Sequence, residues 1–240
     1  MALSLAARGH DVAIHYHRSA DAAEVVAAEA RALGVRAVTL AADLLDDAQT
    51  ETLIPAAAEA LGPLSVLVNN ASVFDYDNIR TATRDTWDRH FQSNLRAPFV
   101  LTQMFAAQAP RADRSGDEPR ARALIVNMLD QRVLKLTPEF STYTLAKMGL
   151  WALTRTAAQG LAPDVRVNAI GPGPTLRGAR QSEDHFARQR GATILERGAD
   201  PADVTAALGY FLDAPSVTGQ LICTDGGQHL AWRTPDILDL

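Results

Sequence analysis

The sequence predicts a doubly wound α/β fold, in which a parallel sheet carries helices on both of its faces. Short apolar runs alternate along the chain with longer amphipathic stretches, which is the pattern of repeated βα units. Two of the runs, Leu64–Val68 and Ala123–Met128, are apolar throughout, as expected of strands covered on both faces. No internal repeat or long low-complexity linker divides the 240 residues, so we expect a single domain over residues 1–240.

The individual elements follow from the residue pattern and from glycine and proline at their ends. Strands are expected at Asp11–His17, Ala37–Ala41, Leu64–Val68, Ala123–Met128, Val165–Ile170 and Gln220–Thr224. Helices are expected at Ser19–Leu33, Ala48–Leu61, Trp87–Ala107, Thr137–Leu161 and Pro201–Leu212. Gly34 ends the first of these helices and Gly62-Pro63 ends the second. The segment Pro110–Arg120 is polar and contains a glycine and two prolines, which predicts an exposed insertion.

Composition excludes several classes of function. The net charge of −5 argues against nucleic acid as a partner, because phosphate binding favours a basic surface. The single cysteine, Cys223, excludes an internal disulfide. No stretch approaches the roughly 18 apolar residues of a membrane span, and Met1–Ala7 lacks the basic start of a signal peptide. We therefore expect a cytoplasmic protein without a membrane partner.

Tyr143 and Lys147 are four residues apart in a predicted helix, so their side chains share one face. An ammonium group near a phenol stabilises the phenolate, and we expect it to lower the pKa of Tyr143 from about 10. Such a tyrosine can donate or accept a proton near neutral pH. The pair occurs by chance in many helices, so its surroundings decide its meaning.

Polar and glycine-rich segments follow three of the predicted strands. Asn69–Ser72 follows Leu64–Val68, Asp130 follows Ala123–Met128, and Gly171-Pro172-Gly173 follows Val165–Ile170. Ligands of open α/β sheets bind at the carboxyl ends of the strands. These segments are therefore expected to form one site.

The whole set of motifs resembles the short-chain dehydrogenase/reductase family over nearly the entire chain. The matching pieces are NNAS at Asn69–Ser72, SN at Ser93-Asn94, YTLAK at Tyr143–Lys147, RVNAIGPG at Arg166–Gly173 and DGG at Asp225–Gly227. The resemblance implies a Rossmann-like fold, with Tyr143 and Lys147 as the acid/base pair and Asn94 as the catalytic asparagine that positions a water chain. The family's catalytic serine lies thirteen residues before the tyrosine, and 143 − 13 gives Asp130 in this sequence.

Aspartate at this place resembles the pteridine reductase-like branch of the family. Further similarities are HYHRS at His15–Ser19, Phe74 at the position of an aromatic residue that stacks on the pterin ring, and the polar insertion before Ala121. The resemblance implies that Phe74, Asp130 and Tyr143 contact the substrate. Other interpretations remain open: Phe74 as a core residue and Asp130 as a surface loop residue. His15 and His17 have no evident third ligand for a metal, so no metal site is expected.

The end of the second strand of such a fold selects the nicotinamide cofactor. Here it carries His17, Arg18 and Ser19. Arg18 can form two parallel hydrogen bonds with a phosphate, and Ser19 can add another or cap the next helix. We therefore expect NADPH as the cofactor. The resemblance adds further cofactor-binding residues: Asp43, Leu44, Asn70, Ala71, Ser72, Tyr143, Lys147, Gly171, Pro172 and Gly173.

The usual first strand and glycine-rich loop of the family are not evident in this sequence. Met1–Arg8 resembles the last part of the first helix, and no Gly-x-x-x-Gly-x-Gly or Gly-x-Gly-x-x-Gly motif occurs. The interpretation is an N-terminally truncated family member, with in-frame codons for the strand and loop expected upstream of Met1. A chain without this phosphate-binding loop should bind NADPH poorly. The missing strand belongs in the middle of the sheet, so two exposed strand edges and a gap in the core are expected.

Three functions remain in competition. The first is NADPH-dependent reduction of a pteridine or dihydrofolate-type substrate, with Asp130 either protonated through a raised pKa or relaying a proton. The second is reduction of ordinary carbonyl compounds, and the third is an inactive family member that acts through oligomer contacts. The resemblance also implies a homodimer or homotetramer, formed by Trp87–Ala107 and Thr137–Leu161 with apolar residues such as Leu150, Trp151 and Leu153.

Overall fold

The computed structural model describes residues 1–178 and 181–232 and has the expected α/β architecture. The strands are β1 (Val12–Tyr16), β2 (Ala37–Ala41), β3 (Val66–Asn69), β4 (Ala123–Met128), β5 (Val165–Pro172) and β6 (Leu221–Thr224). The helices are α1 (Ala2–Ala6), α2 (Ala20–Ala32), α3 (Asp47–Leu61), α4 (Arg84–Phe91), α5 (Ala97–Gln108), α6 (Ser141–Gly160), α7 (Glu183–Gly191) and α8 (Pro201–Asp213). Strand β1 pairs with β2, and β3 to β6 form a second sheet in the order β3-β4-β5-β6. All of these pairings are parallel.

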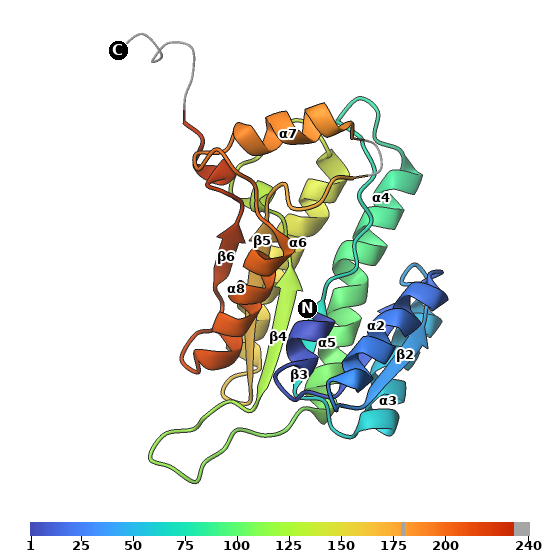
Figure 1. The fold of residues 1–240 in the computed structure, drawn as a ribbon, viewed down its shortest axis with the longest axis vertical. Coiled ribbons are helices and arrows are strands. Elements are labelled where there is room, and N and C mark those ends of the chain that lie inside the picture. Colours follow the sequence, from blue (N-terminus) through green and yellow to red (C-terminus); the bar gives the residue numbers. More distant parts are fainter. Residues whose placement is uncertain (179–180, 233–240) are drawn as a thin grey trace.

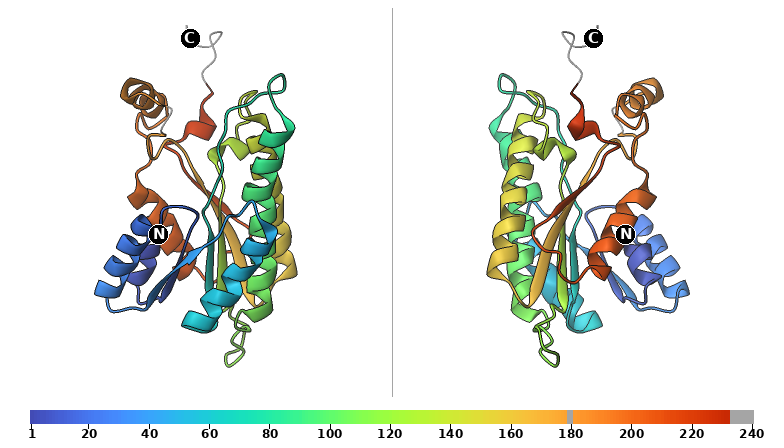
Figure 2. Two further views of the ribbon diagram at one scale, coloured as in Figure 1. Left: turned by 90° about the vertical axis from the view of Figure 1, so that its right-hand side faces the viewer. Right: turned by 90° about the vertical axis from the view of Figure 1, so that its left-hand side faces the viewer.

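Helices cover both faces of the strands, as the sequence predicts (Figures 1 and 2). On one face, α1, α2 and α8 enclose an apolar cluster that includes Leu5, Ala27 and Leu208. On the other face, α3, α5 and α6 enclose a cluster that includes Ile54, Phe105 and Ala158. Strand β4 supplies side chains to both clusters and is buried along its whole length, as a central parallel strand should be.

A groove separates the two sheets at the place where the sequence analysis expects an additional strand. β1 and β3 are not hydrogen-bonded to each other, and the cavity between them has a volume of about 530 Å³. Val12 and Ile14 of β1 lie on one side of it, and Val66 and Val68 of β3 lie on the other. The expected pair of exposed strand edges and the expected gap are therefore present.

The helical region before β4 differs from the single helix predicted at Trp87–Ala107. Helix α4 begins earlier, because Thr83 and Thr86 form a capping box. A π-helical turn, Gln92–Arg96, then separates α4 from α5. Pro98 follows this turn near the start of α5. Since proline has no amide hydrogen, it removes one regular helical bond at this point.

Two other helices also differ from the prediction. Helix α6 begins at Ser141 and not at Thr137, because Pro138 and the left-handed Phe140 (φ 58°) interrupt helical geometry before it. Helix α7 was not predicted at all. It has no buried residue, so it carries no amphipathic pattern that a sequence can reveal.

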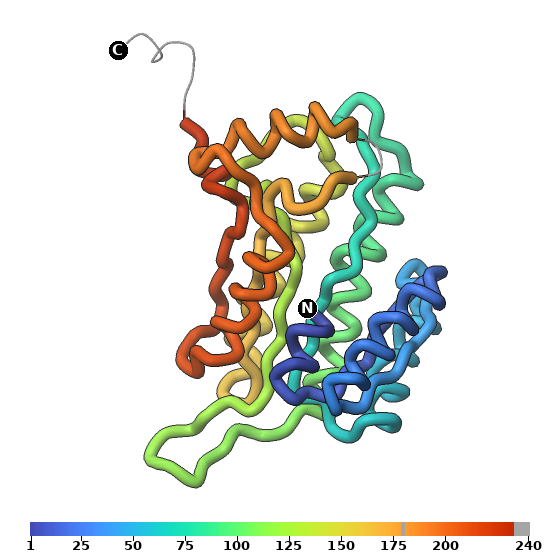
Figure 3. Tube along the Cα trace, in the orientation of Figure 1, coloured from blue at the N-terminus to red at the C-terminus, as the bar shows by residue number. Residues whose placement is uncertain are grey.

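The polar segment Pro110–Arg120 is an exposed loop, as predicted. Its base is closed by paired backbone hydrogen bonds between Asp113 and Arg120, each 2.8 Å. Figure 3 shows the loop, in light green, projecting beyond the end of the sheet.

The helices of the described residues are too short or too polar to cross a bilayer.

Candidate active site

The carboxyl ends of β3, β4 and β5 lie side by side, since the strands are parallel neighbours in the sheet. A buried chain of hydrogen bonds fixes this edge: Asn69 Nδ2 donates to Asn127 Oδ1 at 2.8 Å, and Asn127 Nδ2 donates to Thr154 Oγ1 at 2.9 Å. This chain joins β3, β4 and α6. It therefore sets the start of the Asn70–Ser72 segment relative to the helix that carries Tyr143 and Lys147.

Asp130, Tyr143 and Lys147 lie together at this edge, as expected. The Tyr143 hydroxyl donates to Asp130 Oδ2 at 3.3 Å, and the backbone N–H of Arg132 donates to Asp130 Oδ1 at 2.8 Å. Lys147 Nζ donates to the Met128 carbonyl at 2.8 Å and lies 5.6 Å from the centroid of the Tyr143 ring. Asp130 is thus not a surface loop residue. One of its oxygens is held by the backbone and the other faces the tyrosine.

Burial sets the protonation of these groups. It raises the pKa of Asp130, although the Arg132 N–H, the charges of Arg132 and Lys147, and the Tyr143 hydroxyl act in the opposite direction. Burial and the neighbouring Asp130 also raise the pKa of Tyr143 well above 10, against a hydrogen bond from Ser72. The expectation that Lys147 lowers the Tyr143 pKa is therefore wrong for this molecule, because the carboxyl group is the nearer partner. Burial lowers the pKa of Lys147 to about 8.

The buried ammonium group makes a stability prediction. Replacing Lys147 by methionine should abolish catalysis yet increase the free energy of unfolding by an amount on the order of 1–3 kcal/mol at neutral pH. The cost of burying the charge is largest below the folded pKa of about 8. It should shrink as the pH rises towards the unfolded value of about 10.4. Urea unfolding at several pH values measures the difference, and a variant less stable than the wild type at neutral pH would contradict the argument.

The loop after β3 is held by Asn94, which lies in the π-helical turn. Asn94 Nδ2 donates to the Val73 carbonyl and Asn94 Oδ1 accepts from the Val73 N–H, both at 2.8 Å. The side chain is completely buried. Asn94 therefore anchors the loop through both polar atoms of its side chain, and its expected part in positioning a water chain stays a prediction.

Phe74 extends from this loop to the acid/base pair. Its ring is 46% exposed, which excludes a core role. It stacks on Phe140 with a centroid separation of 4.3 Å and meets the edge of Tyr143 at 4.6 Å. The Arg132 guanidinium lies over the Phe140 ring, 5.0 Å from its centroid. Sequence reasoning found Phe74 but not Phe140 or Arg132, because their place depends on the left-handed backbone before α6.

The residues expected at the adenosine end lie at the carboxyl ends of β1 and β2. Arg18 is exposed and its guanidinium has no polar partner among the described residues. Ser19 is the N-cap residue of α2, but its hydroxyl makes no capping bond, so the expected cap is absent and the hydroxyl is available. His17 Nε2 lies 3.4 Å from Asp43 Oδ2. The Leu44 side chain is buried in the core, so the expected cofactor contact of Leu44, which stays a prediction, would be made by its backbone.

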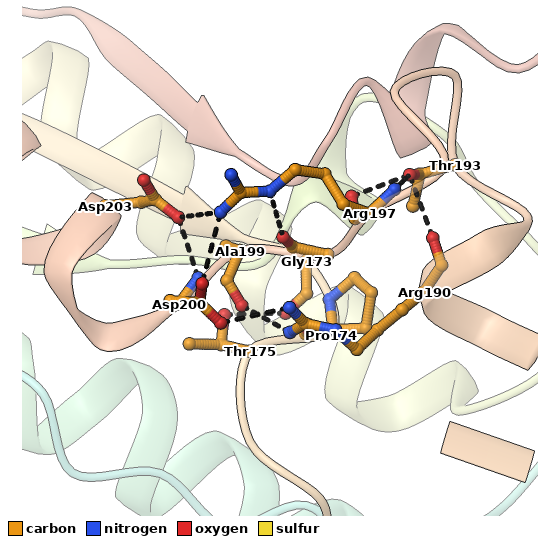
Figure 4. A network of polar contacts seen from close by, with 10 residues as sticks. Gly173, Pro174, Thr175, Arg190, Thr193, Arg197, Ala199, Asp200 and Asp203 are labelled. Atoms are coloured by element: carbon orange, nitrogen blue, oxygen red, sulfur yellow. Dashed lines mark hydrogen bonds and ion pairs between the residues drawn. The ribbon is translucent and has the colours of Figure 1, made fainter. Parts of the chain in front are cut away.

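On the nicotinamide side, Asn70, Ala71 and Ser72 are exposed at the end of β3, and Gly171–Gly173 follow the buried part of β5. Glycine is required at position 173, since a Cβ there would lie 2.7 Å from the Asp225 backbone. The next residues are fixed by a network that the sequence analysis did not predict (Figure 4). Arg190 Nη1 donates to the Pro174 carbonyl at 3.0 Å and to the Ala199 carbonyl at 2.6 Å.

The same network joins α7 to α8. Arg190 Nη2 lies 3.0 Å from Asp200 Oδ1, and Arg197 Nη2 lies 3.1 Å from Asp200 Oδ2. Thr193 Oγ1 donates to the Arg197 carbonyl at 2.8 Å and accepts from the Arg197 N–H at 3.1 Å. The segment after β5 is therefore attached to both α7 and α8.

Comparison with known proteins gives three concordant matches. A family model described as enoyl-(acyl carrier protein) reductase matches residues 1–229. The chain is 30% identical to a short-chain type dehydrogenase/reductase of Picea abies, over 95% of this chain and 86% of that protein. It is 43% identical to the crystal structure of FolM alternative dihydrofolate reductase 1 from Brucella suis in complex with NADP. That match has a TM-score of 0.90 and covers 98% of this chain and 91% of the other.

Proposed function

The chain belongs to the short-chain dehydrogenase/reductase family, and we propose that it is an NADPH-dependent reductase of a pteridine or dihydrofolate-type substrate. The observation that carries this proposal is the half-buried Asp130 carboxyl group, whose Oδ2 faces the Tyr143 hydroxyl at 3.3 Å. The similarity to FolM alternative dihydrofolate reductase 1, a protein described in complex with NADP, supports the same substrate class and cofactor.

The residues at both ends of the site fit NADPH. The exposed Arg18 guanidinium matches the 2′-phosphate in charge and geometry, and the Ser19 hydroxyl lies beside it in sequence without a capping bond. At the other end, the Lys147 ammonium donates one hydrogen to the Met128 carbonyl and has two further donors that can hold ribose hydroxyls. NADPH supplies a hydride when it is bound.

The proton chemistry separates the proposed reaction from carbonyl reduction. Reduction of a C=N bond requires a proton at nitrogen, whereas reduction of C=O requires one at oxygen. Asp130 Oδ1 is occupied by the Arg132 N–H, so Oδ2 is the atom that can carry a proton towards the substrate. The raised pKa of Asp130 increases the protonated fraction, and the proton that leaves Oδ2 is replaced by one from solvent after turnover.

Steady-state NADPH oxidation by a full-length form, which includes the expected upstream strand and glycine-rich loop, tests the proposal with dihydrobiopterin, dihydrofolate and a panel of aldehydes and ketones. We expect turnover of the dihydropterins to exceed that of the carbonyl compounds in kcat/KM. Fast turnover of carbonyl compounds and none of the pterins would favour the second function, which relatives such as the 3-oxoacyl-[acyl-carrier-protein] reductase FabG of Staphylococcus epidermidis illustrate (28% identical over 96% of this chain). A folded protein without turnover of any substrate would favour the inactive, oligomer-forming alternative.

The proposal includes a homodimer or homotetramer built on α4, α5 and α6. Leu150 is buried inside the molecule, so its expected part in the subunit contact is wrong. The exposed apolar side chains of these helices are instead Trp87, Phe99, Leu145 and Met148.

Light scattering at micromolar concentration should give a dimer or tetramer. Phe99→Arg should shift the mass towards a monomer, because it places a charge in the contact. Val25→Arg on α2 is the matched control, because Val25 is also an exposed apolar side chain but lies on the opposite face of the sheet. This variant should leave the mass unchanged. A monomeric wild-type protein would contradict the proposed assembly.

A further inference from the structure

His90 is completely buried on α4 although it is a polar residue. Its Nε2 lies 3.0 Å from the Asp75 backbone nitrogen, and its Nδ1 lies 2.7 Å from Thr142 Oγ1. Thr142 Oγ1 in turn forms a short hydrogen bond with Asp77 Oδ2, and the Thr142 N–H donates to Asp77 Oδ1 at 3.2 Å. Three segments meet here: helix α4, the loop after β3 and the first turn of α6.

The hydrogen-bond directions in this cluster allow only one form of the imidazole. The Asp75 N–H is a donor, so His90 Nε2 must accept and carry no hydrogen. The hydrogen of the neutral ring is therefore on Nδ1 and is donated to Thr142 Oγ1. The hydroxyl of Thr142 is then free to donate to the Asp77 carboxylate. Burial lowers the pKa of His90, which favours the same neutral ring.

The cluster lies directly beside two residues of the candidate site. Phe74 stands between Val73, whose N–H and carbonyl are held by Asn94, and Asp75, whose N–H is held by His90. Asn94 and His90 are four residues apart in the helical segment, so one helix face holds the backbone on both sides of Phe74. Thr142 immediately precedes Tyr143, and the His90 and Tyr143 rings are in edge contact at 5.8 Å.

We propose that neutral His90 is the positioning residue that sets Phe74 against the substrate and Tyr143, through its bonds to the Asp75 N–H and to Thr142. The identity of the substrate rests on the proposed function, whereas the positioning role does not. A proton on Nε2 would set a second donor against the Asp75 N–H, and the bond that holds the loop beside Phe74 would be lost. The loop is then held above the pKa of His90 and released below it.

The charged and titratable groups around His90 have opposing effects. Asp77 and Asp75 of the loop favour the protonated ring, and Arg89 of α4 and burial disfavour it. Tyr143 of α6 faces the ring with its aromatic edge. Arg89 Nε also lies 3.3 Å from Asp75 Oδ2, so the carboxylate of Asp75 is partly balanced by a nearby cation.

A matched pair of variants separates the two bonds of His90. In His90→Gln, the amide oxygen can reach the place of Nε2 and accept from the Asp75 N–H. In His90→Asn, the shorter side chain can reach Thr142 but not Asp75. We expect His90→Asn to raise the KM for dihydropterin about tenfold with a much smaller change in kcat. We expect His90→Gln to stay near the wild-type KM.

Amide hydrogen exchange over residues 73–77 supplies a readout that needs no turnover. Protection of the Asp75 amide should be lost in His90→Asn and retained in His90→Gln. Equal protection and equal KM in the two variants would overturn the proposal. If dihydropterins are not reduced but exchange follows the expected order, the proposed function fails and the positioning role of His90 stands.

The wild-type protein provides the test if a variant does not fold. NMR titration of the His90 ring gives its pKa, and exchange of the Asp75 amide, corrected for the intrinsic effect of pH, should accelerate as the pH falls through that value. Titration of His90 without any change in Asp75 protection would overturn the proposal.

Discussion

Asp130→Ser is expected to lower kcat/KM for dihydropterin reduction by about a hundredfold or more, which is the usual scale for the loss of a general acid. The reason is geometric. Asp130 Oδ2 is the oxygen of the half-buried carboxyl group that faces the Tyr143 hydroxyl, and a serine hydroxyl is too weak an acid to protonate a ring nitrogen. Serine is the residue that carbonyl-reducing members of the family carry here, so the same variant should lose far less of any side activity on aldehydes and ketones.

Two controls isolate the carboxyl group. Asp130→Asn keeps the shape and can still accept from the Arg132 N–H, but it carries no acidic proton, so it should be as impaired as the serine variant. Asp117→Ser, in the exposed loop before β4, should have no effect. An Asp130→Ser enzyme that loses pterin and carbonyl activity to the same extent would show that Asp130 supports the fold of the site rather than proton transfer.

Arg18→Ala is expected to remove most of the preference for NADPH over NADH. A charge-assisted hydrogen bond between Arg18 and the 2′-phosphate contributes about 1.5–3 kcal/mol. This energy corresponds to a preference for NADPH on the order of tenfold to hundredfold. Arg18 has no polar partner among the described residues, so its removal breaks no internal contact. The predicted quantity is the ratio of kcat/KM for NADPH to that for NADH. Contacts with the pyrophosphate do not affect this ratio, because both cofactors contain the same pyrophosphate.

The measurement is the ratio of kcat/KM for the two cofactors in a full-length form, with the expected upstream strand and loop, and in its Arg18→Ala variant. Arg114→Ala, which removes an exposed arginine from the loop before β4, is the matched control and should leave the ratio unchanged. An Arg18→Ala ratio equal to that of the wild type would remove Arg18 from the phosphate site, and Ser19 and His17 would then be the remaining candidates.

Much of the fold was predictable because its parallel strands are buried. Leu64–Val68 and Ala123–Met128 differ from β3 and β4 by two residues at most, since continuous apolar runs leave few other positions for a covered strand. Helix α7 was not predictable, because none of its residues is buried. The π-helical turn at Gln92–Arg96 was also missed, since hydrophobic periodicity does not distinguish it from an ordinary helical turn.

The candidate site was predictable where function depends on residue spacing along the chain. Asp130, Tyr143 and Lys147 were located by their spacing and the structure brings them together. Residues that act through tertiary contacts were not found. His90 was set aside as an ordinary histidine in the sequence, because its partners Asp75 and Thr142 are fifteen and fifty-two residues away along the chain. Arg190 is similar, since it acts on the backbone of Pro174.

The sign of the Tyr143 pKa shift also lay beyond the sequence. The four-residue spacing indicates that Lys147 lies near the ring, but it does not show that the Asp130 carboxyl is the group in contact with the hydroxyl. Burial and that carboxyl raise the Tyr143 pKa. In the free protein the Tyr143 hydroxyl is therefore protonated and donates a hydrogen bond to Asp130.

The pH dependence of kcat/KM for dihydrobiopterin, measured for the wild type and Asp130→Asn, tests the central claim most directly. A general acid must be protonated, so the wild-type value should fall as the pH rises through the raised pKa of Asp130. Titration of Lys147, with a pKa of about 8, should affect both proteins, at a lower pH in the variant because the Asp130 charge that raises this pKa is removed. The account predicts that Asp130→Asn loses the first of these transitions and keeps the second. A variant profile that superimposes on the wild-type profile, in shape and in height, would contradict the assignment of Asp130 as the proton donor.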